Sequence, residues 1–189
     1  MKVKIRSFKD SDTSLLELVE RSLKQNWNKP AYSDYGTDNN YTYGDVAKNV
    51  ARLHAIFKKI GIQPEDKIAI CDKNSSHWAI SFIAVLSYGA VVVPILSDFH
   101  ADQIHHIYKH SESRLMICST KTAKATGIKD VMDIEDLTLI NSDMNYELDE
   151  FKHLKPEDIN FFREDPDALA LISYTSGSTG RSKGVMLPY

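Results

Sequence analysis

The sequence predicts an α/β fold, in which a mostly parallel sheet is flanked by helices on both faces. The first observation is that short apolar runs alternate with helix-length segments between residues 67 and 119. The second is that the runs KIAIC, AVVVPI and RLMICS are apolar at nearly every position, which indicates strands buried on both faces. Strands and helices that alternate in this way are typically joined by right-handed crossovers in a parallel sheet.

The composition is that of an ordinary globular protein, with 42% hydrophobic and 26% charged residues among 189. This length suits one domain, or one domain and part of another. The net charge of −3 gives no electrostatic basis for wrapping nucleic acid. The N-terminus has basic residues without an apolar stretch behind them, so we expect no signal peptide.

Two helices are expected before the alternating region, and each begins at a capping pair. Ser14 and Glu17 open a helix over residues 14–26, and a polar, turn-rich stretch, SDYGTDNN, follows. Thr42 and Asp45 open a second helix, which Gly61 ends. The apolar residues of this second helix recur at helical spacing and require a buried face: Val46, Val50, Leu53, Phe57 and Ile60.

The segment from Asn74 to Ser97 contains no Asp, Glu, Lys or Arg and has the length of a membrane span. Gly89 divides it into SSHWAISFIAVLSY, which has helical character, and AVVVPIL, whose valines and proline favour extended backbone. We therefore expect a buried helix followed by a buried strand. Cys71 and Cys118 also lie in predicted strands, which favours buried, reduced thiols of a cytosolic protein over a disulfide framework.

The last third of the chain has weaker patterns. Residues 120–165 predict short pieces and an acidic, polar surface connection, FKHLKPEDINFFREDPD. ALALISY then predicts one more strand, and GVML begins another. Between these strands lies YTSGSTGRSKGV, Tyr174 to Val185, which is rich in glycine and hydroxyl side chains.

A glycine-rich loop that follows a strand can turn its backbone N–H groups inward and hold oxyanions. The hydroxyls of Thr175, Ser176, Ser178 and Thr179 add donors, and Lys183 adds a positive charge. The spacing differs from that of a P-loop, GxxxxGK with Ser or Thr, and from that of a dinucleotide-binding GxGxxG. The composition is also that of a flexible Gly/Ser linker, so the residues alone leave both interpretations open.

The stretch resembles the phosphate-binding signature YTSGTTGxPKG of the adenylate-forming (AMP-binding) superfamily, which includes acyl-CoA synthetases, amino-acid adenylation domains and luciferases. Eight positions agree in type: Thr175, Ser176, Gly177, Ser178, Thr179, Gly180, Lys183 and Gly184. Ser182 replaces the usual proline, and Pro188 and Tyr189 replace the threonine and histidine that often follow.

Other parts of the chain extend this resemblance from about residue 40 to the end. TYGDVAKNVARLHAIFKKIGIQPEDKIAI is similar to the opening helix and first core strand of the superfamily. NSSHWAISFIAVLSYGAVVVPI, HSESRLMICS and DALALISYTSGSTGRSKGVML most resemble long-chain fatty-acid:CoA ligases, which are acyl-CoA synthetases.

The resemblance implies that residues 1–189 are part of the large N-terminal domain of an adenylate-forming enzyme. Its parts would be a lead-in of a helix and turns (1–40), a βαβαβ core (41–119), a connecting region (120–165), and a strand, the phosphate loop and the start of the next strand (166–189). The implied reaction activates a carboxylic acid, on the closer resemblance a long-chain fatty acid, as an acyl-adenylate and transfers it to CoA. The residues that would bind the ATP phosphates are Thr175, Ser176, Gly177, Ser178, Thr179, Gly180 and Lys183.

The resemblance also implies what this part of an enzyme would lack. In the superfamily, the adenine pocket, the acyl tunnel, the magnesium-binding glutamate and the catalytic lysine follow the phosphate loop. We therefore expect no catalytic residue and no metal ligand within residues 1–189, and no activity of this fragment alone. An amino-acid or aryl-acid adenylating enzyme, and a non-catalytic interaction module on the same fold, stay open as alternatives.

The expected cofactors and partners are small molecules. ATP, Mg²⁺, a fatty acid and CoA would serve the complete protein, and no nucleic acid is expected. The expected location is the cytoplasm. Peripheral membrane association of the whole enzyme and its oligomeric state stay open.

Three further groups of residues are better explained by structure than by function. His106 and His110 lie one helical turn apart, near His100 and His105, but no cysteine or carboxylate completes a zinc set, so we expect a solvated helix face. A second group consists of aromatic and aliphatic residues at helical spacing. These could line a lipid pocket, but such residues are far more often core, so we assign them to packing: Trp78, Phe82, Val85 and Leu86. A third group is assigned to the solvated side of its helix: Arg52, Lys58 and Lys59.

Overall fold

The computed structural model describes residues 14–140, 142–161, 165, 167–175 and 183–189. The helices are α1 (Leu15–Gln25), α2 (Tyr43–Lys59), α3 (Ser76–Ser87), α4 (Ala101–His110) and α5 (Thr120–Thr126), with two short 3-10 helices, η1 (Leu148–Phe151) and η2 (Pro156–Asp158). The strands are β1 (Pro30–Ser33), β2 (Asn40–Thr42), β3 (Lys67–Cys71), β4 (Val91–Pro94), β5 (Leu115–Cys118), β6 (Val131–Asp133), β7 (Thr138–Leu139), β8 (Leu169–Thr175) and β9 (Lys183–Pro188).

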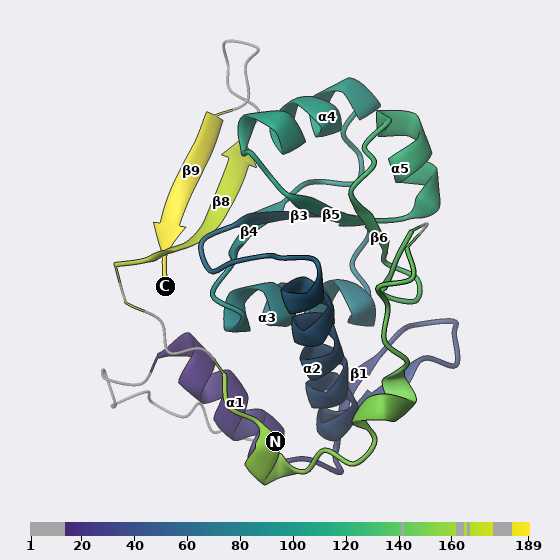
Figure 1. Cartoon of the computed structure of the whole chain (residues 1–189), viewed down its shortest axis with the longest axis vertical. Helices are drawn as coiled ribbons and strands as arrows, with labels where there is room; N and C mark the ends of the chain where they lie inside the picture. The colour runs from purple at the N-terminus through teal and green to yellow at the C-terminus, as the bar shows by residue number, and fades with distance from the viewer. Residues whose placement is uncertain (1–13, 141, 162–164, 166, 176–182) are drawn as a thin grey trace, which may run out of the picture.

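The main sheet has the strand order β7-β6-β5-β3-β4-β8-β9 and is mostly parallel. Its five inner strands pair in parallel, and the edge strands β7 and β9 are antiparallel to their neighbours. The sheet crosses the middle of the molecule, with α4 and α5 on one face and α2 and α3 on the other (Figure 1). The predicted α/β class is confirmed.

A separate apolar core lies on each face of the sheet. Leu53 and Phe57 of α2 and Ile80 of α3 belong to the first core and are fully buried. Ile107 of α4 and Met116 of β5 belong to the second core and are also fully buried. Because strand residues alternate between the faces, the successive apolar residues of β3 (68–71) and β5 (115–118) supply both cores at once.

Both predicted capping pairs are present. The Ser14 side chain accepts a hydrogen bond from the Glu17 N–H, and the Glu17 carboxylate accepts one from the Ser14 N–H, each at 3.2 Å. Thr42 and Asp45 make the same reciprocal bonds at the start of α2. Gly61 follows the end of α2 with a φ of +79°, a conformation that glycine adopts without steric cost.

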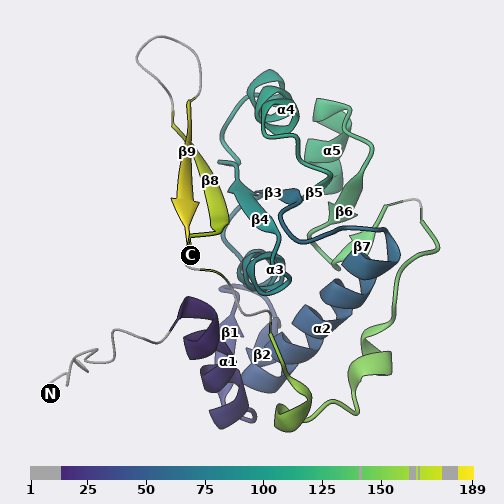
Figure 2. The ribbon, with the colours of Figure 1, turned by 60° about the vertical axis from the view of Figure 1, so that its left-hand side comes forward.

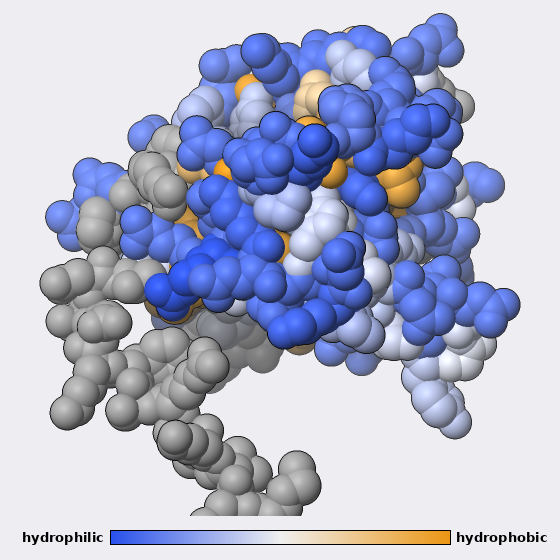
Figure 3. Space-filling view, turned by 90° about the horizontal axis from the view of Figure 1, so that it is seen from below, coloured by the Kyte–Doolittle hydropathy of each residue, from blue (hydrophilic) through white to orange (hydrophobic). Residues whose placement is uncertain are grey.

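The uncharged segment from Asn74 to Ser97 forms α3 and β4, as predicted. None of the described helices combines the length and apolar character that crossing a membrane requires. The face seen from below in Figure 3 is mainly hydrophilic, with scattered hydrophobic residues. Val85 and Leu86 are buried in the first core, and Trp78 and Phe82 pack against it with their rings stacked 5.4 Å apart.

The two cysteines lie side by side on adjacent strands. Cys71 of β3 and Cys118 of β5 are register partners, and both are buried and free, as predicted. Burial raises the pKa of each thiol to about 12. Both thiols are therefore protonated at neutral pH, which makes them poor nucleophiles.

Two regions contain more regular structure than the sequence predicted. Residues 120–165 are not only a surface connection, because α5, β6 and β7 lie there and Met132 and Leu137 are fully buried. β6 has three residues and β7 has two, which is too short to give a periodic signal. The turn-rich stretch SDYGTDNN is the connection of a small hairpin, whose short strands β1 and β2 the sequence did not indicate.

Arg52 is not on a solvated helix face, so that prediction was wrong. Only 7% of the residue is exposed, and its guanidinium donates to the backbone oxygens of Tyr146 at 2.7 Å and Asp136 at 3.1 Å. A buried guanidinium needs such partners, and here it fastens the segment after β6 to α2. Lys58 and Lys59 are exposed, as predicted.

Candidate functional site

A crevice opens where β3 and β4 end. The chain leaves β3 toward α3 on one face of the sheet and leaves β4 toward α4 on the other face (Figure 1). Adjacent parallel strands whose connections diverge in this way leave a crevice at their carboxyl ends, which is the usual ligand position in open α/β sheets. A hollow of about 560 Å³ lies at this place, and we call it the β3/β4 crevice.

Three strands contribute to the walls of the β3/β4 crevice. The lining residues come from the connection after β3, from the end of β4 and the connection after it, from the end of β8 and from α3: Asp72, Lys73, Asn74, Pro94, Ile95, Leu96, Ser97, Asp98, Ser173, Tyr174 and Trp78. The end of β8 is the point at which the sequence predicts the phosphate loop. The crevice therefore adjoins the described end of β8, from which the predicted loop would start.

The structure describes the two ends of the predicted phosphate loop. Thr175 is the last residue of β8, Lys183 is the first residue of β9, and the two are register partners across the antiparallel pair. Both are exposed. The other predicted phosphate ligands lie outside the described residues: Ser176, Gly177, Ser178, Thr179 and Gly180. Figure 2 shows β8 and β9 standing at the edge of the molecule.

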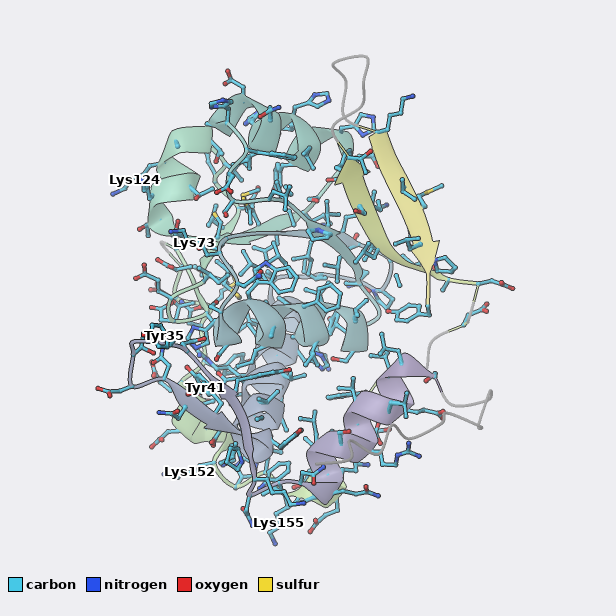
Figure 4. All side chains as sticks on the ribbon, turned by 180° about the vertical axis from the view of Figure 1, so that it is seen from behind. Tyr35, Tyr41, Lys73, Lys124, Lys152 and Lys155 are labelled. Atoms are coloured by element: carbon cyan, nitrogen blue, oxygen red, sulfur yellow. The ribbon has the colours of Figure 1, made fainter. Side chains whose placement is uncertain are left out.

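Lys73 is a second exposed cation of the site, and the sequence analysis did not single it out. It comes from the connection between β3 and α3 and lines the β3/β4 crevice (Figure 4). Within the part of the chain that the structure describes, neither Lys73 nor Lys183 forms an ion pair. Both ammonium groups are thus available to an anion. Lys73 lies two residues after the end of β3, the first buried strand, and this position was a signal that could have identified it.

Asp72 has a structural task at the mouth of the crevice. One carboxylate oxygen accepts from the Ser119 N–H at 3.0 Å, and the other accepts from the Lys73 N–H at 2.7 Å. These bonds join the carboxyl ends of β3 and β5 and fix the backbone that carries Lys73.

The amino end of α3 also lies near the crevice, but protein groups already occupy it. The Ser75 hydroxyl accepts from the Trp78 N–H at 3.1 Å. Asp34, the residue directly after β1, accepts from both the N–H and the hydroxyl of Ser76, at 2.7 and 2.9 Å. An anion would have to displace these bonds, so we do not assign this helix end to a ligand.

Tyr174 is the last buried residue before the predicted loop. Its hydroxyl lies 2.7 Å from Nδ1 of His110, and the two rings meet edge to face with centroids 5.7 Å apart. Burial raises the pKa of the Tyr174 hydroxyl, so this group is neutral at physiological pH. On β9, Gly184 is the register partner of Tyr174.

The histidines of α4 do not form a metal site with other described residues. Among the described residues, no three His, Cys, Asp or Glu side chains are placed to hold an ion. The rings of His106 and His110 are neighbours, with centroids 5.7 Å apart, and His105 Nδ1 lies 3.0 Å from the Thr126 carbonyl oxygen. His100, His106 and His110 are exposed, in agreement with the expected helix face.

Another hollow, of about 590 Å³, lies at the opposite edge of the sheet, near the amino ends of β5 and β6. Its charged lining residues have both signs: Lys109, Glu112, Arg114, Lys129 and Asp130. Arg114 is already paired with Asp66. Mixed, partly paired charges select no ligand class, so the β3/β4 crevice remains the candidate site.

A family model and several known proteins match this chain. A family model described as "AMP-binding enzyme" matches residues 19–189. The chain is 28% identical over 179 residues to luciferin 4-monooxygenase of Photuris pensylvanica, covering 84% of this chain and 32% of that protein. It is 31% identical over 173 residues to the nonribosomal peptide synthetase easA of Emericella nidulans, covering 90% of this chain and 2% of that protein.

A solved structure agrees with the fold. The fatty acyl-adenylate ligase of L. pneumophila, crystallised with acyl adenylate and pyrophosphate, superposes with a TM-score of 0.72 at 19% identity. The match covers 94% of this chain and 31% of that one. The chain thus spans about a third or less of the length of each of these three proteins.

Proposed function

The chain belongs to the AMP-binding enzyme family, and on that premise we propose that it is the N-terminal part of an ATP-dependent ligase that forms an acyl-adenylate. The phosphate loop, Thr175 to Lys183, would hold the phosphates of ATP. The observation that carries this proposal is the position of the loop: its two described ends are paired at the carboxyl edge of the sheet, beside the β3/β4 crevice.

The chemistry of the described ends suits a polyphosphate. Lys183 carries a positive charge with no ion-pair partner among the described residues, and the Thr175 hydroxyl is a hydrogen-bond donor on an exposed residue. Ser176, Gly177, Ser178, Thr179 and Gly180 would complete the set with hydroxyl and backbone N–H donors. The donor set contains no general base, so the loop would bind and orient rather than transfer protons.

In the proposed reaction, a substrate carboxylate attacks the α-phosphorus of ATP and the bond to the β-phosphate oxygen breaks. Pyrophosphate leaves with increased negative charge, which Lys183 and the loop donors would stabilise. Mg²⁺, when bound, neutralises phosphate charge. We propose that the ligands for Mg²⁺ and the remaining catalytic groups belong to other parts of the complete protein.

We propose a long-chain fatty acid as the substrate and CoA as the acceptor. The support is the resemblance of NSSHWAISFIAVLSYGAVVVPI, HSESRLMICS and DALALISYTSGSTGRSKGVML to long-chain fatty-acid:CoA ligases. An amino-acid or aryl-acid adenylating enzyme is an equal alternative. The 31% identity to a nonribosomal peptide synthetase supports the amino-acid class. The cytoplasmic location of the protein stays a prediction.

Acid-dependent exchange of pyrophosphate into ATP tests the proposal. The full-length protein that carries this chain would be assayed with a long-chain fatty acid, a set of amino acids and an aryl acid in parallel. Exchange with the fatty acid alone supports the proposed substrate. Exchange with an amino acid or the aryl acid instead supports the alternative class of adenylating enzyme. No exchange with any acid would favour a non-catalytic interaction module.

A further inference from the structure

Core packing along β4 holds β8, and a register pair and a hydrogen bond of the β8/β9 hairpin lie toward the end away from the predicted loop. Among the described residues, β8 has one register partner on β4, the pair Leu171 and Val92. At the far end of β9, the Tyr189 hydroxyl donates to the Leu86 carbonyl at 2.8 Å. Beyond Leu171, the register partners of β8 are on β9, whose residues from Lys183 to Pro188 are exposed.

Among the described residues, one polar contact joins the loop end of the hairpin to α4, that between Tyr174 and His110. The 2.7 Å separation of the Tyr174 hydroxyl and His110 Nδ1 is that of a good hydrogen bond. His110 ends a helix whose Ile104, Ile107 and Tyr108 are buried, so the histidine is presented by a fixed element. Tyr174 itself is 9% exposed, and its ring packs in the second core.

The same tyrosine ring contacts the returning strand. A Cβ added to Gly184 would lie 3.2 Å from the ring of Tyr174 and 3.0 Å from Ile172. The ring therefore covers the glycine closely, an arrangement that compensates for the missing side chain of a glycine in an edge strand. Tyr174 therefore contacts both arms of the hairpin, and its hydrogen bond to His110 adds to core packing in fixing their position. The next pair toward the loop is Thr175 with Lys183.

We propose that His110 is a positioning residue for the ATP phosphates, which acts through the Tyr174 hydroxyl on Thr175 and Lys183. This inference rests on the proposed function, because it concerns the same loop. His110 contacts no substrate in this scheme. It fixes the place of Thr175 and Lys183, and a displacement of these two residues would weaken phosphate binding because oriented donors lose their geometry.

The test is the dissociation constant of MgATP, measured by calorimetry on the full-length protein that carries this chain. His110→Ala removes the partner of the tyrosine, and Tyr174→Phe removes only the hydroxyl. Each is expected to weaken MgATP binding roughly five-fold, the equivalent of one ordinary hydrogen bond. The double variant is expected to bind no more weakly than either single variant, because both remove the same interaction.

Two further variants separate positioning from general packing. His110→Asn retains a polar atom near the place of Nδ1 and is expected to restore most of the affinity. His106→Ala removes the neighbouring ring on the same helix face and is expected to leave the affinity unchanged. Melting temperatures identify any variant that fails to fold, and if His110→Ala is such a variant, Tyr174→Phe decides.

The possible results are distinct. If the wild-type protein binds MgATP and both His110→Ala and Tyr174→Phe bind it equally well, this inference is overturned. The proposed function then still stands. The inference is also overturned if His110→Asn binds as weakly as His110→Ala, because the effect would then not pass through Nδ1. If the wild-type protein does not bind MgATP, both the proposed function and this inference are wrong.

Discussion

Thr175 and Lys183 are paired residues, the last of β8 and the first of β9. Paired residues in an antiparallel ladder have Cα atoms about 5 Å apart. The two described ends of the predicted phosphate loop are therefore neighbours, at the end of a strand that lines the β3/β4 crevice. The pairing therefore places a hydroxyl and an ammonium group side by side at the carboxyl edge of the sheet.

A side chain at position 184 should destabilise the hairpin. Gly184→Ala places a Cβ 3.0 Å from Ile172 and 3.2 Å from the ring of Tyr174, which is closer than such contacts normally are. We expect a loss of about 1–3 kcal/mol in the free energy of unfolding, measured by urea denaturation. Val185→Ala, at the adjacent exposed position, should change it by less than about 0.5 kcal/mol. Equal effects of the two variants would show that the close contact is absent.

Two serines of α3 should respond in opposite ways to alanine. Ser81 is fully buried, and its hydroxyl has no hydrogen-bond partner among the described residues. Ser87 is 1% exposed, and its hydroxyl donates to the Ile83 carbonyl at 2.6 Å and contacts His54 Nε2 at 3.0 Å. Ser81→Ala should leave the free energy of unfolding unchanged or raise it by up to about 1 kcal/mol, because burying an unpaired hydroxyl is costly.

Ser87→Ala should lower the free energy of unfolding by about 1 kcal/mol or more, because it removes a partner of His54. Since both substitutions lie on the same helix, differences in helix propensity cancel in the comparison. A destabilising Ser81→Ala would indicate that its hydroxyl has a partner that the geometry does not reveal.

His54 should make the protein less stable as the pH falls. Its Nε2 lies 3.0 Å from the Ala84 carbonyl oxygen, and burial lowers its pKa from 6.5 to about 4. The unfolded chain therefore takes up a proton that the folded chain resists, and stability is lost between pH 6.5 and pH 4. The difference corresponds to about 3 kcal/mol when fully developed.

The measurement is the free energy of unfolding as a function of pH for wild type and His54→Gln. Glutamine does not titrate, so the curve of the variant should be flatter between pH 6.5 and pH 4. His106→Ala, which removes an exposed histidine of α4, serves as the control and should keep the wild-type slope. Parallel curves for wild type and His54→Gln would contradict the assignment of a half-buried, neutral imidazole.

The sequence predicted the elements whose signals are local. The capping pairs Ser14–Glu17 and Thr42–Asp45, the periodic face of α2 and the apolar runs of β3, β4 and β5 are each contained in a few consecutive turns or residues. Together they were sufficient for the fold class. β6 and β7 were missed because two or three residues contain no period.

The candidate site was predictable only in part. The loop residues from Thr175 to Lys183 form a contiguous motif, so the sequence alone could propose them. The contact between His110 and Tyr174 joins residues 64 positions apart, and no local pattern predicts such a pair. Arg52 was misassigned for the same reason, since its backbone partners at Asp136 and Tyr146 are far away in sequence.

MgATP binding by Lys183→Ala tests the account most directly. Removing this ammonium group from the full-length protein should weaken binding by roughly ten-fold or more, the effect of one charge-assisted hydrogen bond. Lys152→Ala, which removes an exposed lysine paired with Asp149 (Figure 4), should bind as the wild type does. The contradicting result is a wild-type protein that binds MgATP and a Lys183→Ala variant that binds it equally tightly. In that case Lys183 does not hold the nucleotide, and the account is wrong.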